Sequence, residues 1–323
     1  MALDIKNNFL PDSVISKYAP LVCLHPEEKY FPCSTDWLLR HSTFHYTQNG
    51  QPQQTFIIKD EELLHVQNSA NVTDMHLMIH ENAFQGQRTA TETGDVPMYA
   101  VVRKVVDIAT DSFLFWEVTY LFLYAFNKGK ALFCGALNIG DHTGDWEHVT
   151  VRLDGNHELL GVWYAAHSSK EGQWVKATHV PQTKSNRIIV YSSLGSHASY
   201  PSNNTVVRIY CFGNDYNSDN GILWDPKIVM RVNADHEIIK MDADELSAIQ
   251  KWAFDPSTVN FNVNVKNPEC VKNHRVFCPV VEHDPTAKWH QYKGEWGETA
   301  PPSEWDTNPE PSESCTAWKR FFH

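Results

Sequence analysis

The stretch Gly140–Leu153 reads Gly-Asp-His-Thr-Gly-Asp-Trp-Glu-His-Val-Thr-Val-Arg-Leu, and it decides the fold that the sequence predicts. Residues 149–153 alternate apolar and polar side chains, as a strand that is buried on one face does. The same alternation, traced backwards, places Asp145 and Glu147 on the apolar face and Trp146 on the other. Because an isolated buried charge is costly, a cation, an arginine or a proton must compensate these two carboxylates.

Length and composition describe a globular protein that is rich in β-structure. Of the 323 residues, 42% are hydrophobic and 20% are charged, which excludes a disordered chain. The 11 tryptophans, 12 tyrosines and 16 phenylalanines favour strands over helices. These features predict a mainly β fold, an antiparallel β-sandwich or jelly-roll-like domain with a few peripheral helices. We assign this single domain to residues 1–298, and a tail rich in proline and acidic residues to 299–323.

Local patterns predict the individual elements. Strands are expected at 113–126, 159–165, 187–192, 206–212 and 228–232, together with a hairpin that turns at Asn49-Gly50. Helices are expected at 10–19 and 242–252, and a long loop at 81–97. The run 113–126 is the most apolar one, but it is too short to cross a bilayer as a helix and it contains Glu117. No transmembrane segment is therefore predicted.

Net charge and short motifs narrow the classes of function. With 27 basic and 39 acidic residues the net charge is −12, which argues against a nucleic-acid partner, because such a partner needs a basic surface. The seven cysteines form no C-x-x-C pair, which predicts free buried thiols. The first eight residues have no apolar signal core, so the expected location is the cytoplasm, with membrane contact limited to a peripheral one. No glycine-rich phosphate loop, H-E-x-x-H or G-x-S-x-G motif is present, which excludes P-loop enzymes, zincins and α/β-hydrolases.

Acidic and imidazole side chains in and around the opening stretch form a candidate metal site. Two further histidines, His167 and His197, occur at the ends of predicted strands. If the strands at 147–153, 159–165 and 187–192 are neighbours, these histidines converge on the loop that begins at Gly140. The predicted metal ligands are Asp141, His142, Asp145, Glu147, His167 and His197. Such a mixed set suits a divalent metal ion: Ca²⁺, Mg²⁺, Mn²⁺, Fe²⁺ or Zn²⁺.

Two other interpretations of these side chains stay open. Arg103 or Arg187 would neutralise the two strand carboxylates in a purely structural network, or the cluster would perform acid–base chemistry without a metal. Ser196 beside His197 is not interpreted as a nucleophile and its base, because adjacent residues of an extended chain point in opposite directions.

A set of motifs occurs in a fixed order along the chain. They are Pro97-Met98-Tyr99-Ala100, Tyr120 to Asn127, the core Gly140–His148, His167-Ser168 with Trp174, Tyr191 to Pro201, Trp224-Asp225-Pro226 and Gly294-Glu295-Trp296-Gly297. In this order and over residues 18–298, the chain resembles the family of vacuolar protein sorting-associated protein 62. The resemblance implies a role in trafficking and no known activity.

The core Gly140–His148 is also similar to the G-H-R-H-D-W-E heptad of the necrosis-inducing, ethylene-inducing peptide-like cytolysins. Asp145, Trp146 and Glu147 match the D-W-E of that heptad, and His142 falls near a heptad histidine with the spacing altered by one residue. Members of that family are β-sandwich proteins that hold a divalent cation with the heptad and act on plant membranes. The resemblance implies a cation at Asp145 and Glu147.

We therefore expect a divalent-cation-binding β-sandwich protein that binds a small polar or lipid-like ligand. Its ligand would be the polar head group of a lipid or a glycan, in a trafficking or membrane-associated role. The alternative is a metal-dependent enzyme of the hydrolase or lyase type, with His142 or His197 as general base. A deep aromatic-lined pocket at the ion would favour the enzyme, and a shallow site beside exposed aromatic residues would favour binding.

Overall fold

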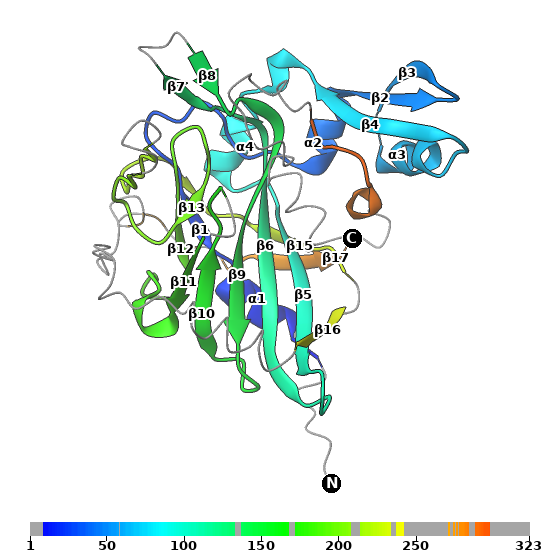
Figure 1. Ribbon diagram of the computed structural model, residues 1–323. Coiled ribbons are helices and arrows are strands. Elements are labelled where there is room, and N and C mark those ends of the chain that lie inside the picture. The colour runs from blue at the N-terminus through cyan, green and yellow to red at the C-terminus, as the bar shows by residue number, and fades with distance from the viewer. Residues whose placement is uncertain are drawn as a thin grey trace.

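In the part of the chain that the structure describes, three sheets and a small hairpin make up the β-structure (Figure 1). The computed structural model describes residues 9–57, 59–132, 137–167, 172–207, 214–233, 237–241, 271, 274, 276, 278–283 and 288–297. Within these residues, no helix is long and apolar enough to span a bilayer.

The central sheet has eight strands in the order β11-β10-β9-β6-β5-β15-β17, with β16 also paired to β5. Its strands are β5 (Met98–Asp107), β6 (Phe113–Asn127), β9 (His142–Leu153), β10 (Leu159–Tyr164), β11 (Gln173–Lys176), β15 (Ile228–Arg231), β16 (Glu237–Met241) and β17 (Val280–His283). The pairs from β11 to β5 are antiparallel, whereas β15 and β16 run parallel to β5 and β17 runs parallel to β15. The long pair β6 and β9 places Tyr124 opposite Asp145.

Two smaller sheets pack against the central one. The first has the order β13-β12-β1-β14, with β1 (Leu21–Cys23), β12 (Ile189–Ser192), β13 (Ser199–Tyr200) and β14 (Leu223–Trp224). The second has the order β3-β2-β4, with β2 (Ser42–Gln48), β3 (Gln51–Phe56) and β4 (Val72–Ile79). Strands β7 (Lys130–Leu132) and β8 (Leu137–Ile139) form a separate hairpin. The helices are α1 (Asp12–Tyr18), α2 (Thr35–Arg40), α3 (Asp60–Gln67) and α4 (Arg88–Thr93), with 3₁₀ turns η2 (Glu81–Ala83), η4 (Ala177–His179) and η7 (Trp289–Gln291).

Alternation along β9 divides its apolar side chains between two cores. On one face, Val149 belongs to a buried cluster with Val22 and Val190 of the four-stranded sheet. On the opposite face, Trp146 belongs to a cluster with Phe44 of the three-stranded sheet. The central sheet is therefore the middle layer of three, and Figure 1 shows the three-stranded sheet projecting beside its upper end.

The predicted fold class is confirmed: the protein is mainly β, with several antiparallel sheets and few helices. The hairpin at Asn49-Gly50, the strand at 113–126 and the helix within 10–19 are also confirmed. The predicted loop at 81–97 is wrong, because η2 and α4 occupy much of it. Only Thr91 of α4 is buried, so this helix shows no apolar periodicity in the sequence.

Other predictions lie wholly or partly outside the described residues. They are the helix at 242–252, residues 208–212 of the strand at 206–212, and the tail at 299–323. The domain boundary at residue 298 therefore stays a prediction. The cysteine prediction is wrong at Cys23, which is disulfide-bonded, whereas Cys33 and Cys278 are free. Spacing along the chain is a local signal and does not reveal a bond between distant cysteines.

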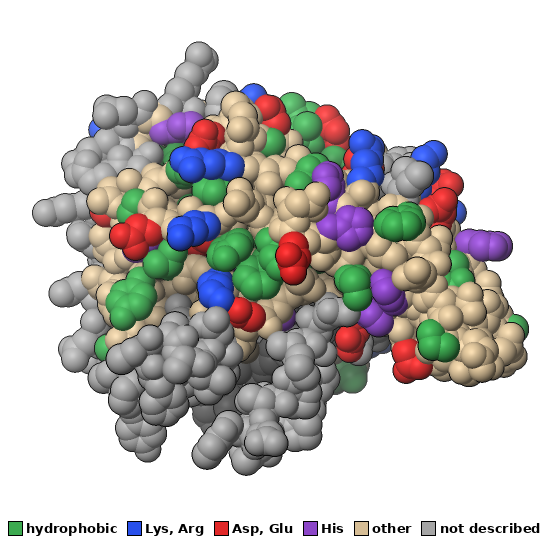
Figure 2. Space-filling model, turned by 90° about the horizontal axis from the view of Figure 1, so that it is seen from above, with side chains coloured by type: hydrophobic (Ala, Val, Ile, Leu, Met, Phe, Trp, Pro, Cys, Tyr) green, Lys and Arg blue, Asp and Glu red, His purple; other side chains and the backbone are tan. Residues whose placement is uncertain are grey.

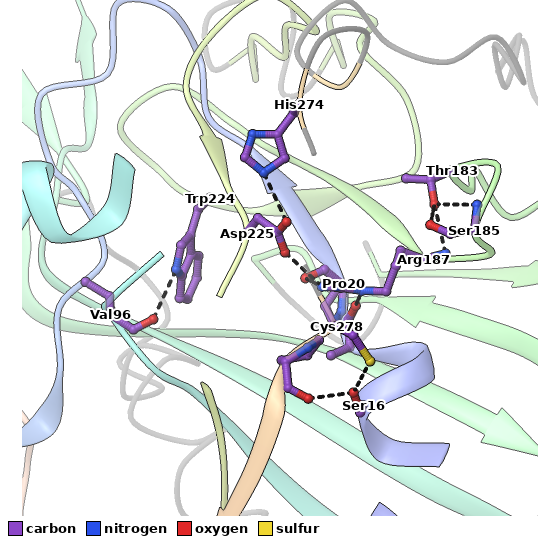
Figure 3. Close-up of polar contacts among 12 residues, drawn as sticks. Ser16, Pro20, Val96, Thr183, Ser185, Arg187, Trp224, Asp225, His274 and Cys278 are labelled. Carbon is purple, nitrogen blue, oxygen red and sulfur yellow. Dashed lines mark hydrogen bonds and ion pairs between the residues drawn. The ribbon is translucent and has the colours of Figure 1, made fainter. Parts of the chain in front are cut away.

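A buried ion pair joins the four-stranded sheet to the segment that follows α1. Arg187 and Asp225 are 3% and 2% exposed, and Arg187 Nη2 lies 3.3 Å from Asp225 Oδ1. Arg187 also donates to the backbone carbonyls of Ala19 and Pro20. Figure 3 shows Asp225 between Arg187 and His274, whose Nε2 lies 3.0 Å from Asp225 Oδ2. Arg187 is thus committed to Asp225 and does not neutralise the carboxylates of β9.

Removal of the charge at Asp225 is expected to destabilise the fold strongly. Asp225→Asn would leave the buried guanidinium of Arg187 without its carboxylate, which typically costs about 3–5 kcal/mol. The measurement is urea unfolding followed by circular dichroism. Asp95→Asn is the matched control, because the Asp95–Lys227 pair is largely exposed and should be worth less than about 1 kcal/mol. Equal losses in the two variants would contradict the buried pair.

Candidate functional site

His197 lies at the centre of a buried charge cluster between the central and the four-stranded sheet. Its side chain is 0% exposed, its Nδ1 lies 2.8 Å from Asp145 Oδ2, and its Nε2 lies 3.7 Å from Glu28 Oε1. The imidazole also stacks on Tyr124, with ring centroids 3.8 Å apart. Burial lowers the pKa of His197, but the hydrogen bond to Asp145 and the nearby charge of Glu28 outweigh it and raise the pKa to about 9. At neutral pH, His197 is therefore a cation held between two carboxylates.

The turn between β12 and β13 brings His197 to this position. His197 has a left-handed φ of 56°, and Gly195 has a φ of 74°. The turn closes through two backbone bonds, in which His197 N–H donates to Ser193 O and Ser193 N–H donates to Ala198 O. Gly195 N–H also donates to Glu28 Oε2 at 2.8 Å. Glu28 thus contacts both the backbone of this turn and the His197 side chain that the turn carries.

Glu28 is fixed by its own backbone. Its Oε1 accepts the N–H groups of Lys29 and Tyr30, both at 2.9 Å. Burial acts to raise the pKa of Glu28, but His197 and the backbone donors together lower it below the ordinary value. Glu28 therefore stays ionised inside the protein.

Glu147 is the carboxylate of this region that has no compensating partner among the described residues. It follows Asp145 on the same face of β9, as the alternation predicts, and is half-buried. No hydrogen bond or ion pair joins its carboxylate to any described residue. Burial raises the pKa of Glu147 well above its ordinary value, and the charges of Asp145 and Asp215 raise it further. Glu147 is therefore the carboxyl group of this region that most readily takes up a proton, or a cation in its place.

A second imidazole–carboxylate pair lies beside the first. His167 Nε2 is 2.7 Å from Asp215 Oδ2, and Asp215 also accepts the hydroxyl groups of Ser196 at 2.9 Å and Tyr200 at 2.8 Å. Asp215 is 0% exposed, whereas the side chain of His167 is 24% exposed. Ser196 and His197 thus bind different carboxylates, in agreement with the interpretation that they are not a catalytic pair.

The two remaining predicted ligands differ in their surroundings. Asp141 accepts Lys128 Nζ at 2.6 Å and Gly129 N–H at 2.7 Å, so its charge is already matched. His142 Nε2 lies 3.9 Å from Asp145 Oδ1, and the His142 side chain is 16% exposed. Of these two, only His142 lies near a carboxylate of β9, that of Asp145.

The structure brings only some of the predicted residues together: His142 and His197 lie near Asp145, whereas His167 lies against Asp215 and Asp141 against Lys128. β9 and β10 are neighbours, but β12 belongs to the other sheet, so the condition under which the histidines were expected to converge is not met. His197 meets Asp145 because the two sheets pack face to face. Arg103, the other arginine considered, is paired with Glu237 at 2.9 Å. In the described part of the chain, no group of three or more His, Cys, Asp or Glu is placed to hold a metal ion, so the metal ligands stay a prediction.

Sequence reasoning missed Glu28 and Asp215, two of the carboxylates of the cluster. Glu28 lies in a turn after β1, where no alternation of apolar residues marks a buried face. Asp215 forms an isolated bridge with Val206, again outside any regular strand. A buried charge leaves a signal in sequence only where its neighbours define a face, and these two residues have no such neighbours.

A segment near the end of the described chain packs tightly on the start of β9. Trp296 contacts Trp146 edge to face, with ring centroids 5.5 Å apart. A Cβ at Gly144 would overlap the carbonyl oxygen of Trp296, and a Cβ at Gly297 would overlap that of Thr143. The glycines allow two backbones to approach closely, and residues 294–297 (the Trp296 segment) thereby hold the strand that carries Asp145.

The chain is similar to proteins named for vacuolar sorting. Residues 7–243 match the family described as Vps62, vacuolar protein sorting-associated protein 62. In Saccharomyces cerevisiae (strain S288c), the putative vacuolar protein sorting-associated protein TDA6 is 27% identical over 267 residues, which cover 68% of this chain and 53% of the relative. Vacuolar protein sorting-associated protein 62 of the same yeast is 27% identical over 251 residues, which cover 68% and 52%. The chain spans about half the length of these curated relatives.

Similarity to solved structures is weak. Necrosis and Ethylene inducing Protein 2 from the causal agent of cocoa's Witches Broom disease is 11% identical, with a TM-score of 0.32. The match covers 60% of this chain and 70% of that one. At this TM-score the likeness supports no conclusion about fold or function.

Gly144→Ala is expected to dislodge the Trp296 segment. The left-handed φ of 69° alone costs about 1–2 kcal/mol for a residue with a Cβ, and the overlap with Trp296 O should add to this. We expect a larger loss of stability in urea and a shift of tryptophan emission. Gly50→Ala is the matched control, since Gly50 has a φ of 74° with nothing within 4 Å of the added Cβ. If both variants lose the same stability, the Trp296 segment does not press on β9.

Stability is expected to fall as the pH rises from 6.5 to 9. The pKa of His197 is about 9 in the folded protein and 6.5 ordinarily, so the folded chain holds an extra proton in this window. The stabilisation is complete below pH 6.5 and is lost as the pH rises through about 9. At about 1.4 kcal/mol for each pH unit, it amounts to roughly 3 kcal/mol.

The measurement is the free energy of unfolding in urea at a series of pH values, for the native protein and for His197→Gln. The native protein should lose more stability between pH 6.5 and 9 than the variant, whatever the absolute stability of each. Parallel curves would show that the imidazole carries no charge in the folded state.

Proposed function

The chain belongs to the vacuolar protein sorting-associated protein 62 family, and from this premise we propose that it is a divalent-cation-binding β-sandwich protein that holds a polar head group. The head group would be that of a lipid or a glycan, in a trafficking or membrane-associated role. The observation that carries the proposal is Glu147, a half-buried carboxylate without a partner among the described residues and beside two other carboxylates. A divalent cation is the partner that removes this repulsion most directly.

The donors of the proposed cation site are Glu147, Asp145 and His142. Asp145 uses Oδ2 for His197, so that Oδ1, which faces His142 at 3.9 Å, is its donor to the ion. Asp141, His167 and His197, which the sequence also offered, are committed to Lys128, Asp215 and the pair of Asp145 and Glu28. A set dominated by carboxylate oxygens suits Ca²⁺, Mg²⁺ or Mn²⁺.

An incomplete set of protein ligands favours binding of a head group. The described residues hold no preformed group of three ligands, so an ion at Glu147 would take further ligands from water and from the bound molecule. Phosphate and hydroxyl oxygens of a head group are ligands of this kind. The ion would then serve as a bridge between the protein and its ligand.

The proposed location is a membrane surface. This agrees with the trafficking role that the family name suggests. The cytoplasm stays the location predicted from the sequence, and the disulfide at Cys23 counts against it, because disulfides are rare in reducing compartments.

A metal-dependent hydrolase or lyase is the second candidate, and one observation favours it. The partly exposed His167 is held by the buried carboxylate of Asp215, the arrangement that orients a general base. His142 is the other accessible imidazole. His197 is enclosed between Asp145 and Glu28 with no exposed surface, so it would act by positioning Asp145 and would not touch a substrate.

Glu147→Gln is expected to abolish the response to divalent ions while leaving the fold intact. Because glutamine is neutral, like the protonated form that the raised pKa of Glu147 favours, the variant should be at least as stable as the native protein without added metal. In the native protein, Ca²⁺, Mg²⁺ or Mn²⁺ should raise the melting temperature, and elemental analysis should find a bound ion. In the variant, ion affinity should fall at least tenfold.

Asp141→Asn is the control, because Asp141 is matched by Lys128 and should not contribute to ion binding. Head-group binding is tested by sedimentation with vesicles of phosphatidylcholine that contain phosphatidylserine or a glycosylceramide, each with the active ion and with chelator. Ion-dependent sedimentation that Glu147→Gln loses would support the proposal. An unchanged melting temperature with all three ions in the native protein would overturn it.

A further inference from the structure

The outer face of the three-stranded sheet carries a histidine pair that the candidate site does not use. Along β2 and β4, Phe44 and Leu77 point into the core. Their neighbours His45 and His76 therefore point to the opposite face, where both are partly exposed. Figure 2 shows that, on the face seen from above, histidine side chains gather on the half that carries this sheet.

His45 and His76 are placed side by side by the register of the sheet. They are direct partners in the antiparallel pairing of β2 and β4. Their rings are stacked at 23°, with centroids 5.2 Å apart. Because the backbone pairing of the two strands holds direct cross-strand partners close, no loop has to become ordered to bring the two rings together.

Two further polar side chains extend the same row across the sheet. Gln54 of β3 is the partner of His45 on one side. On the other side, Glu295 forms a parallel bridge with His76, secured by the bonds Leu77 N–H to Glu295 O and Glu295 N–H to Met75 O, both 2.9 Å. The row thus runs from an amide through two imidazoles to a carboxylate.

We propose that His45 and His76 bind a borderline transition-metal ion of the Zn²⁺, Cu²⁺ or Ni²⁺ class. Neutral imidazole is the side chain that these ions prefer, and two imidazoles on adjacent strands can reach one ion by rotation about their side-chain bonds. Glu295 is the neighbour that supplies a third ligand, and water completes the shell. The described residues hold no group of three ligands already in place, so this is an open site that forms as the ion binds.

The site is independent of the proposed cation site. It uses imidazoles on the outer sheet, whereas the other uses the carboxylates of β9, and it selects borderline ions over hard ones. One segment connects the two sites: Glu295 belongs to the Trp296 segment, which packs on Gly144 of β9. An ion at His76 and Glu295 would therefore also fasten that segment.

Calorimetric titration with Zn²⁺ tests the proposal in the Glu147→Gln protein, which removes the other site from the measurement. We expect one ion to bind, with at least a tenfold loss of affinity in His45→Asn and in His76→Asn. Glu295→Gln should lose less affinity than either. His65→Asn is the control, because His65 is an exposed histidine on α3 outside the pair.

Circular dichroism without metal ensures that each variant is folded, and excess Ca²⁺ should not compete for the site. Zn²⁺ binding that survives in both His45→Asn and His76→Asn would overturn the proposal, as would the absence of binding in the Glu147→Gln protein. If the Glu147→Gln protein loses its response to Ca²⁺, Mg²⁺ and Mn²⁺ but still binds Zn²⁺, the two sites are distinct.

Discussion

The ionic contact of His197 with Asp145 and Glu28 is the constraint on which the site depends. It joins a turn of the four-stranded sheet to the long strand β9 and to the segment after β1. Because all three groups are buried, the imidazolium and the two carboxylates stabilise one another, and loss of any one would leave an unmatched charge. The contact thereby fixes how the two sheets meet at this end of the sandwich.

This contact leaves the region with more negative than positive charge. His197 and Lys128 compensate Asp145, Glu28 and Asp141, and His167 faces Asp215. Glu147 receives no such partner from the described residues, although it stands among these groups. A half-buried carboxylate without a partner costs stability unless a proton or a cation neutralises it, which is why the proposed cation site is placed at Glu147.

The other face of β9 supports the same strand mechanically. Trp146 packs with Trp289 and Trp296, and the backbone of the Trp296 segment lies directly on Gly144. The carboxylate-bearing face is thus backed by an aromatic cluster that belongs to the second core. Strand β9 is held from both sides, which limits the freedom of Asp145 and Glu147 to move apart and suits a site whose donors must stay close together.

The sequence by itself determined the mainly β fold, the strand β9, and the face on which Asp145 and Glu147 lie. Each follows from a local repeat, because alternation along a strand has a fixed period and needs no partner to be recognised. Only the tertiary structure decided which groups meet these carboxylates. Glu28 and Asp215 come from turns without a repeat, and His197 arrives from another sheet and not from a neighbouring strand. Contacts between layers depend on how sheets stack, and a pattern within one strand carries no information about that.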